Sequence, residues 1–110
     1  MKPIVSAALA TLLALAATAA SAADINAGRA KAEQVCAACH VKDGNTPVDP
    51  SYPRLAGQHR DYLYRALMDY KTEARRNAIM QAQAKQLSKQ EMQDLAAYYA
   101  SLPGQMSVRK

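Results

Sequence analysis

Cys36-Ala37-Ala38-Cys39-His40 is the stretch that decides how this chain folds. Two cysteines separated by two residues and followed directly by histidine are typical of a covalent haem attachment site. The two thiols can form thioethers with the vinyl groups on one edge of the porphyrin, and the histidine then lies under the ring as an iron ligand. The chain has one such motif, so we expect one haem, with Cys36 and Cys39 as its tethers and His40 as the proximal ligand.

A cysteine pair at this spacing also occurs in zinc sites, thioredoxin-like redox proteins and structural disulfides. A tetrahedral zinc site needs two further ligands, whereas the sequence has no third cysteine and only one other histidine, His59. A thioredoxin-like motif is expected among alternating strands and helices, and the sequence shows no convincing strand pattern. These observations favour haem attachment.

Residues 1–22 have the pattern of a secretory signal peptide. Lys2 provides the positive start, residues 4–19 form an apolar stretch, and Ala20-Ser21-Ala22 is a small-residue cleavage site. The apolar run is short for a membrane span. We therefore expect a cleaved leader and no stable membrane insertion.

Cleavage is expected after Ala22 or Ala23, because acidic Asp24 follows the leader in place of a basic stop signal. This leaves residues 23–110 as one domain in the periplasm. In bacteria, export also takes the chain to the compartment where haem is attached to such motifs. The leader and the attachment motif therefore support each other.

The chain contains neither phenylalanine nor tryptophan. A domain this small buries a limited core and usually needs a disulfide, a metal or a cofactor for stability. A porphyrin would supply the large apolar body that the sequence lacks. The formal net charge of +5 comes from scattered basic residues without interleaved aromatic residues, so no nucleic-acid partner is expected. The charge fits docking on an acidic protein and an ordinary solvated surface equally well.

Apolar periodicity predicts three helices, and hence an all-α fold. They span about residues 25–35, 58–75 and 88–102. The third begins with the capping box Ser88-Lys89-Gln90-Glu91. Residues 41–57 are rich in glycine and proline and are predicted as a loop, whereas residues 76–87 have weaker periodicity and are expected to be an irregular crossing segment. Gly28, inside the first helix, predicts that another helix crosses closely there.

The far face of the iron needs a sixth ligand, and five side chains are candidates: His59, Met68, Met80, Met92 and Met106. A methionine thioether favours ferrous iron and raises the potential, which suits an electron carrier. Met80 is the predicted ligand, because the crossing segment that contains it can wrap the far face of the porphyrin.

The other candidates have simpler interpretations. Met92 belongs to the apolar face of the third helix and is predicted to be core. Met68 lies on the flank of the second helix, at the haem pocket or at the surface. Met106 is in a short polar tail, and His59 is expected to face solvent at the start of the second helix.

Taken together, the motifs resemble those of bacterial class I cytochromes c, which are small periplasmic monohaem proteins. The resemblance covers nearly all of the chain after the leader. It rests on the helix that runs into the attachment motif and on three further stretches. These are Tyr52-Pro53-Arg54-Leu55-Ala56-Gly57-Gln58, Arg76-Asn77-Ala78-Ile79-Met80 and Leu95-Ala96-Ala97-Tyr98-Tyr99.

The resemblance implies three main helices wrapped around one haem, with His40 and Met80 as axial ligands. It implies that the Pro53 carbonyl accepts a hydrogen bond from the proximal histidine and fixes its orientation. Arg76 and Asn77 match positions near the haem edge, where propionates or the methionine loop are hydrogen-bonded. Gly28 matches the position where the first helix crosses the last, against Leu95 and Tyr98.

Two positions depart from the family pattern. Val41 stands where a glycine often follows the histidine, which leaves the backbone path after the motif open. Glu73-Ala74 replaces a frequent glycine before the methionine loop, so the second helix is expected to run further than usual.

The expected function is one-electron transport, without enzymatic activity. Electrons would pass through the exposed porphyrin edge to redox partners such as a membrane oxidase, a reductase or a dehydrogenase, with Lys42, Arg54 and Lys85 as a docking rim. Two alternatives remain open: a haem subunit of a larger dehydrogenase or oxidase complex, and an enzyme or gas sensor in which Met80 leaves the iron open.

Overall fold

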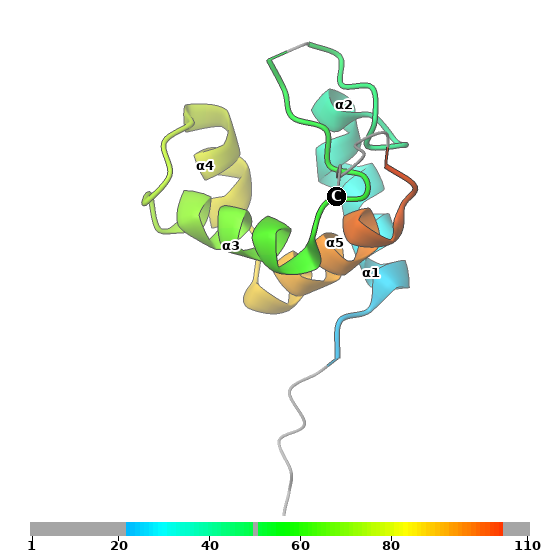
Figure 1. The fold of residues 1–110 in the computed structure, drawn as a ribbon. Helices are drawn as coiled ribbons and strands as arrows, with labels where there is room; N and C mark the ends of the chain where they lie inside the picture. Colours follow the sequence, from blue (N-terminus) through cyan, green and yellow to red (C-terminus); the bar gives the residue numbers. More distant parts are fainter. Residues whose placement is uncertain (1–21, 50, 105–110) are drawn as a thin grey trace, which may run out of the picture.

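The computed structural model describes residues 22–49 and 51–104, so Met106 and the predicted leader up to Ser21 lie outside the described residues. Within these ranges every regular element is a helix, which confirms the all-α fold class (Figure 1). The elements are α1 (Ile25–Lys31), the π-helical segment η1 (Ala32–Cys36), α2 (Ala37–His40), α3 (Arg60–Lys71), α4 (Ala78–Lys85) and α5 (Lys89–Ser101). None of these helices combines the length and the hydrophobicity needed to span a bilayer.

The first helical run contains the whole attachment motif. Its start is capped by Asp24, whose side chain accepts hydrogen bonds from the backbone N–H groups of Asn26 and Ala27. Sequence periodicity placed the end of this helix near residue 35, but the run continues through η1 and α2 to His40, because no helix breaker intervenes before Val41. The π-helical segment shifts the helical register where the motif begins, at Cys36, and such segments are frequent at functional sites.

The second helix, α3, is shorter than predicted. It ends at Lys71, whereas the sequence predicted a helix to about residue 75 or beyond. The chain turns because Glu73 adopts a left-handed conformation, with φ at 66°. The Glu73 carboxylate also forms an ion pair with Lys85 at 2.5 Å. The prediction that this helix runs further than usual is therefore wrong, because Glu73 adopts the left-handed conformation that is usual for glycine.

The crossing segment contains a fourth helix, α4, where an irregular path was expected. Asn77 caps it by accepting a hydrogen bond from the backbone N–H of Met80 at 3.0 Å. The apolar periodicity of α4 is weak because most of its residues are alanine or glutamine. Ala84 is the only buried residue of this helix. Met80 therefore lies in the first turn of a helix.

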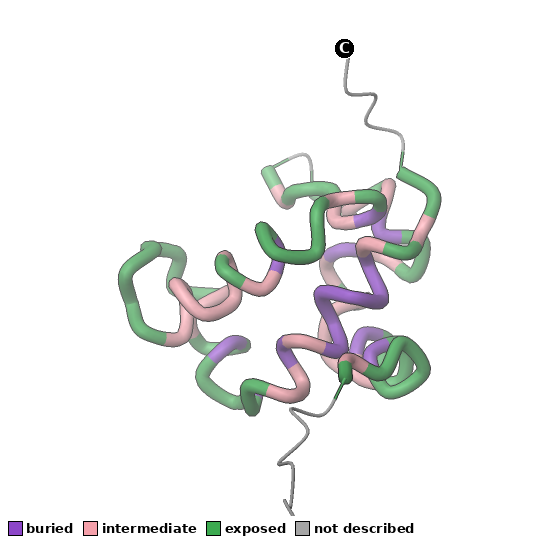
Figure 2. Tube along the Cα trace, turned by 60° about the horizontal axis from the view of Figure 1, so that its bottom comes forward, coloured by how far each residue is buried: buried purple, intermediate pink, exposed green. Residues whose placement is uncertain are grey.

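Helices α1 and α5 cross closely, and α5 forms most of the core (Figures 1 and 2). Gly28 makes this crossing possible, because a Cβ atom there would lie 2.1 Å from the Asp94 carbonyl oxygen and 2.9 Å from the Tyr98 Cβ. Met92 and Leu95 are the largest fully buried side chains, which confirms Met92 as core.

The loop of residues 41–57 is held against the end of α5. The Gly44 carbonyl accepts a hydrogen bond from the Leu55 N–H at 2.8 Å, and the Gly57 N–H donates to the Tyr99 carbonyl at 3.0 Å. Gly57 has a positive φ of 75° and touches the backbone of Gly104, where a side chain would not fit. The Val48 N–H also donates a hydrogen bond to the Cys39 carbonyl at 3.0 Å, which connects the loop to α2.

Candidate functional site

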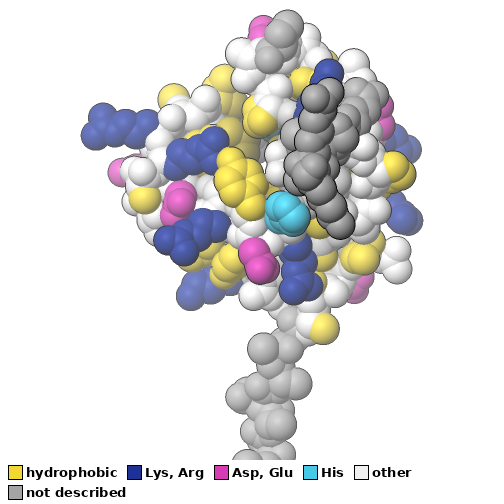
Figure 3. Space-filling view, in the orientation of Figure 1, with side chains coloured by type: hydrophobic (Ala, Val, Ile, Leu, Met, Phe, Trp, Pro, Cys, Tyr) yellow, Lys and Arg dark blue, Asp and Glu magenta, His cyan; other side chains and the backbone are white. Residues whose placement is uncertain are grey.

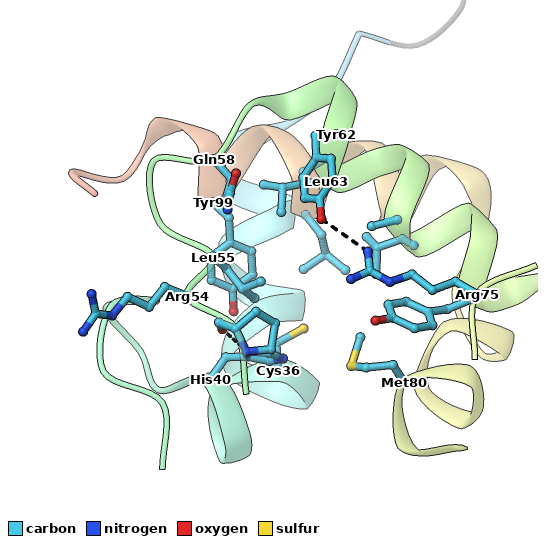
Figure 4. Close-up of a pocket in the computed structure, with 16 residues that line it drawn as sticks. Cys36, His40, Arg54, Leu55, Gln58, Tyr62, Leu63, Arg75, Met80 and Tyr99 are labelled. Atoms are coloured by element: carbon cyan, nitrogen blue, oxygen red, sulfur yellow. Dashed lines mark hydrogen bonds between the residues drawn. The ribbon is translucent and has the colours of Figure 1, made fainter. Parts of the chain in front are cut away.

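A largely apolar cavity lies between the attachment motif on one side and helices α3 and α4 on the other (Figure 4). In the space-filling view, hydrophobic side chains form a hollow with Lys and Arg side chains beside it (Figure 3). The apolar lining includes Leu55, Leu63, Ala66, Leu67, Leu95 and Ala96.

His40 is buried at the cavity wall with one ring nitrogen held by the backbone. Its Nδ1 lies 3.0 Å from the Pro53 carbonyl oxygen. Because a carbonyl can only accept, Nδ1 carries the proton and donates, which leaves the lone pair on Nε2. Burial lowers the pKa of His40, and the hydrogen bond to Pro53 opposes this effect only in part. The ring is therefore neutral and oriented, as an imidazole ligand must be.

Of the two cysteines, Cys36 lines the cavity and Cys39 is not among the lining residues. They are not joined by a disulfide. Burial raises the pKa of Cys36 to about 11, and a hydrogen bond with Tyr99 only partly offsets it. A reactive thioredoxin-like pair needs a stabilised thiolate, which this environment disfavours. The Cys36 thiol is thus suited to serve as a tether.

Met80 lies on the opposite side of the cavity from His40 (Figure 4). Of the candidate sixth ligands that lie in the described ranges, Met80 alone lines the cavity. Met68 packs against the core cluster, Met92 has no exposed surface, and His59 is exposed at the cap of α3. The structure thus brings one imidazole nitrogen and one thioether to facing walls.

Arg75, rather than its neighbour Arg76, belongs to the cavity. The Arg75 guanidinium donates a hydrogen bond to the Tyr62 hydroxyl at 3.4 Å and lies 5.0 Å from the centre of the Tyr70 ring. Both arginines are exposed, but Arg76 lines a separate shallow surface groove together with Asn77. Sequence reasoning missed Arg75 and both tyrosines. An arginine doublet just beyond a helix gives no indication of which residue faces inward.

The predicted docking rim is only partly at this site. Arg54 lines the cavity, whereas Lys42 and Lys85 do not. Lys42 forms an ion pair with Glu33 at 3.5 Å, and Lys85 forms the ion pair with Glu73 already described. The cationic groups at the cavity are therefore the guanidinium groups of Arg54 and Arg75.

These residues fit a haem by their chemistry. The apolar hollow can accept a flat hydrophobic ring, facing nitrogen and sulfur donors are available for iron, and a cysteine lies at the same wall. The two arginines provide counterions for carboxylates at the edge of such a ring.

Comparison with known proteins identifies the same kind of molecule. The family model described as cytochrome c matches residues 25–103. Cytochrome c4 of Thiocapsa roseopersicina is 51% identical over 80 residues, which cover 73% of this chain and 41% of that protein. A protein of Stutzerimonas stutzeri named thiosulfate dehydrogenase electron acceptor is 38% identical over 76 residues, which cover 69% of this chain and 35% of that one.

A solved structure is similar as well. The crystal structure of reduced recombinant cytochrome c4 from Pseudomonas stutzeri matches with a TM-score of 0.69 and 38% identity, over 76% of this chain and 47% of that chain. The chain spans about two fifths of the length of the curated cytochromes c4 that it matches.

Proposed function

The chain belongs to the cytochrome c family, and from that premise we propose that it is a periplasmic one-electron carrier and not an enzyme. Its cofactor is covalently bound haem c, which supplies a one-electron iron couple. The observation that carries the proposal is the pair of donors facing each other across one apolar cavity, His40 and Met80. With these two side chains bound to the iron, no position on it would be left for a substrate.

The residues of the motif have distinct proposed roles. Cys36 and Cys39 would hold the haem as thioether tethers, and His40 would bind the iron through Nε2. Pro53 fixes the orientation of the imidazole through the 3.0 Å hydrogen bond to Nδ1. Because both the ring and its partner are held, the ligand does not need to move when an electron enters or leaves.

Met80 is proposed as the second axial ligand, with Asn77 as its positioning residue. The Asn77 side chain caps α4 at the N–H of Met80 itself, so it fixes the backbone from which the thioether reaches the cavity. The leucines around the cavity exclude water and disfavour the more highly charged oxidation state. A thioether ligand and an apolar wall would thus act in the same direction and raise the reduction potential of the haem.

Arg54 and Arg75 are proposed to bind the haem propionates and to contribute to a basic docking surface, with Arg75 in the position expected for Arg76. Cleavage of the leader removes Lys2 and leaves a formal net charge of +4 on the polypeptide, which is consistent with partners that have acidic surfaces. A periplasmic dehydrogenase is a reasonable electron donor, because a relative bears the name thiosulfate dehydrogenase electron acceptor. A membrane oxidase or reductase is the proposed acceptor.

A redox titration of the exported protein and two methionine variants tests this function. We expect a reversible one-electron transition in the wild type and no binding of carbon monoxide. Met80→Ala should lower the midpoint potential and allow carbon monoxide to bind. Met68→Ala is the matched control, since Met68 does not line the cavity, and it should behave as the wild type. Carbon monoxide binding by the wild type would instead indicate a sensor or an enzyme.

A further inference from the structure

Asp94 is a buried carboxylate that the electron-transfer site does not use. It lies on α5 beside Gly28, with only 6% of its surface exposed. Its Oδ1 accepts two hydrogen bonds of 2.8 Å, one from the Gln90 side-chain amide and one from the backbone N–H of Asp24. Both donors are neutral.

The carboxylate has no cationic partner among the described residues. Lys31 of α1 is paired with Glu91 at 2.8 Å, and the Arg29 guanidinium lies 5.9 Å from the centre of the Tyr98 ring. Arg60 lines the neighbouring groove but forms no ion pair with Asp94. Buried carboxylates are normally paired with a cation, because an unpaired buried charge is costly. An asparagine would accept the same two hydrogen bonds without that cost.

The backbone N–H that donates to Asp94 belongs to Asp24, which lies in the segment where leader cleavage is expected. Ala22 and Ala23 lie in a groove lined by residues of α3 and α5, and the Gln90 amide that binds Asp94 also lies 3.5 Å from the Ala22 carbonyl oxygen. The segment is therefore held on α5 by the same two side chains. Cleavage after Ala22 or Ala23 would create a new amino terminus at this point.

We propose that the α-ammonium group released by leader cleavage is the counterion of Asp94. Hydrolysis of the peptide bond by an export peptidase consumes one water and leaves a carboxylate on the leader and an ammonium group on the domain. In a chain that begins at Asp24, the ammonium nitrogen is the atom already 2.8 Å from Asp94. In a chain that begins at Ala23, it is one peptide unit away. Cleavage of the leader would thus add an ion pair to the contact between α1 and α5.

This inference rests on the export part of the proposed function and does not depend on the haem ligands. The α-amino group of the purified haem protein is acetylated near pH 6.5. Its ordinary pKa is about 7.7–8.0, against about 10.4 for lysine, but pairing with Asp94 would raise it, so peptide mass mapping verifies that the α-nitrogen is the acetylated one. Reductive dimethylation is the matched control, since it modifies the same nitrogen but keeps the charge.

We expect intact mass to show a chain that begins at Ala23 or Asp24. Acetylation should lower the Tm of the wild type by about 4–8 °C, the shift that roughly 1 kcal/mol produces in a domain of this size. Dimethylation should leave the Tm nearly unchanged. In Asp94→Asn, acetylation should have no effect, whereas in Glu91→Gln, which removes another carboxylate of α5, it should act as in the wild type.

Three results would overturn the proposal: an amino terminus upstream of Ala23, equal effects of acetylation and dimethylation in the wild type, or an undiminished effect of acetylation in Asp94→Asn. If Asp94→Asn yields too little protein, the comparison of acetylated with dimethylated wild type tests the proposal on its own. The haem absorption spectrum should be the same in all samples, so failure here is distinguishable from failure of the proposed electron-transfer function.

Discussion

Val41 shows how a single residue can carry backbone strain beside the ligand. It follows His40 directly and adopts φ 63° and ψ 158°, a region that is populated almost only by glycine. Its N–H donates to the Ala37 carbonyl, and its own carbonyl accepts from Gly44 at 3.1 Å. These bonds hold a conformation that costs a β-branched residue roughly 1–3 kcal/mol. The backbone path that the sequence left open is thus the one a glycine would take.

Replacing this residue should stabilise the protein. We expect Val41→Gly to raise the free energy of unfolding by about 1 kcal/mol, because relief of the strain exceeds the entropic cost of a glycine, roughly 0.5–1 kcal/mol. Chemical denaturation of the haem protein measures the change. Val48→Gly, at an exposed position of the same loop with negative φ, is the control and should be neutral or destabilising. A Val41→Gly protein no more stable than the control would show that the site tolerates valine without strain.

Individual residues also show which parts of the site could be predicted from the sequence. Cys36, Cys39 and His40 are adjacent in the sequence, so their chemistry is visible in the motif itself. The contact of His40 with Pro53 is not local, and only family resemblance indicated it. The choice between Arg75 and Arg76 depends on the turn at residue 73, whose left-handed backbone no propensity predicts for glutamate.

Among the helices, the crossing of α1 and α5 is the contact most sensitive to size. Gly28→Ala would place a methyl group 2.1 Å from a backbone oxygen, so one helix must move. We expect a loss of about 1–3 kcal/mol or more in the free energy of unfolding. Ala30→Ser, which adds an atom on an exposed face of α1, should stay within about 0.5 kcal/mol of the wild type. Denaturant titration compares them, and equal stability of the two variants would refute a close crossing.

The start of α5 makes a second prediction, for acid stability. Glu91 completes the capping box with Ser88 and pairs with Lys31, and the Lys31 hydrogen bond is the main reason that the pKa of Glu91 is lowered. A carboxyl with a lowered pKa in the folded state stabilises above its unfolded pKa of about 4.3, and this stability is lost as the pH falls through the folded value.

Glu91→Gln isolates the charge, because glutamine can also complete a capping box. At pH 7 we expect it to be less stable than the wild type by about 0.2–1 kcal/mol, the usual value of an exposed ion pair. The difference should shrink towards zero when thermal unfolding is repeated below pH 4. Glu33→Gln removes the looser 3.5 Å pair with Lys42 and should show a smaller difference at pH 7. A gap that persists in acid would assign the effect to packing and not to charge.

Element boundaries were predictable where local signals are strong. Helix α5 begins at its capping box and ends before Pro103, as the sequence indicated. Helix α4 was missed because its apolar face is made of alanine, although alanine, glutamine and lysine are all good helix formers. Apolar periodicity is strong in a helix that buries much of its surface. Helix α4 buries little of its surface, so its periodicity is weak.

In the molecule as a whole, the cofactor is expected to act as part of the core. The chain has no phenylalanine or tryptophan, and Leu63 of α3 and Leu95 of α5 belong to the core cluster and also line the cavity. The described residues form a close α1–α5 crossing with an open pocket beside it, and this arrangement uses five α-helices and the π-helical segment η1. It also places the ligands on separate elements, His40 on α2 and Met80 on α4.

The central claim is that these two side chains hold the iron from opposite sides. X-ray absorption at the iron edge of the purified wild-type protein measures the identity of the nearest atoms directly. The account predicts one sulfur among them, retained in Met68→Ala and lost in Met80→Ala. A wild-type iron with only nitrogen or oxygen neighbours, or a sulfur that persists in Met80→Ala, would contradict it.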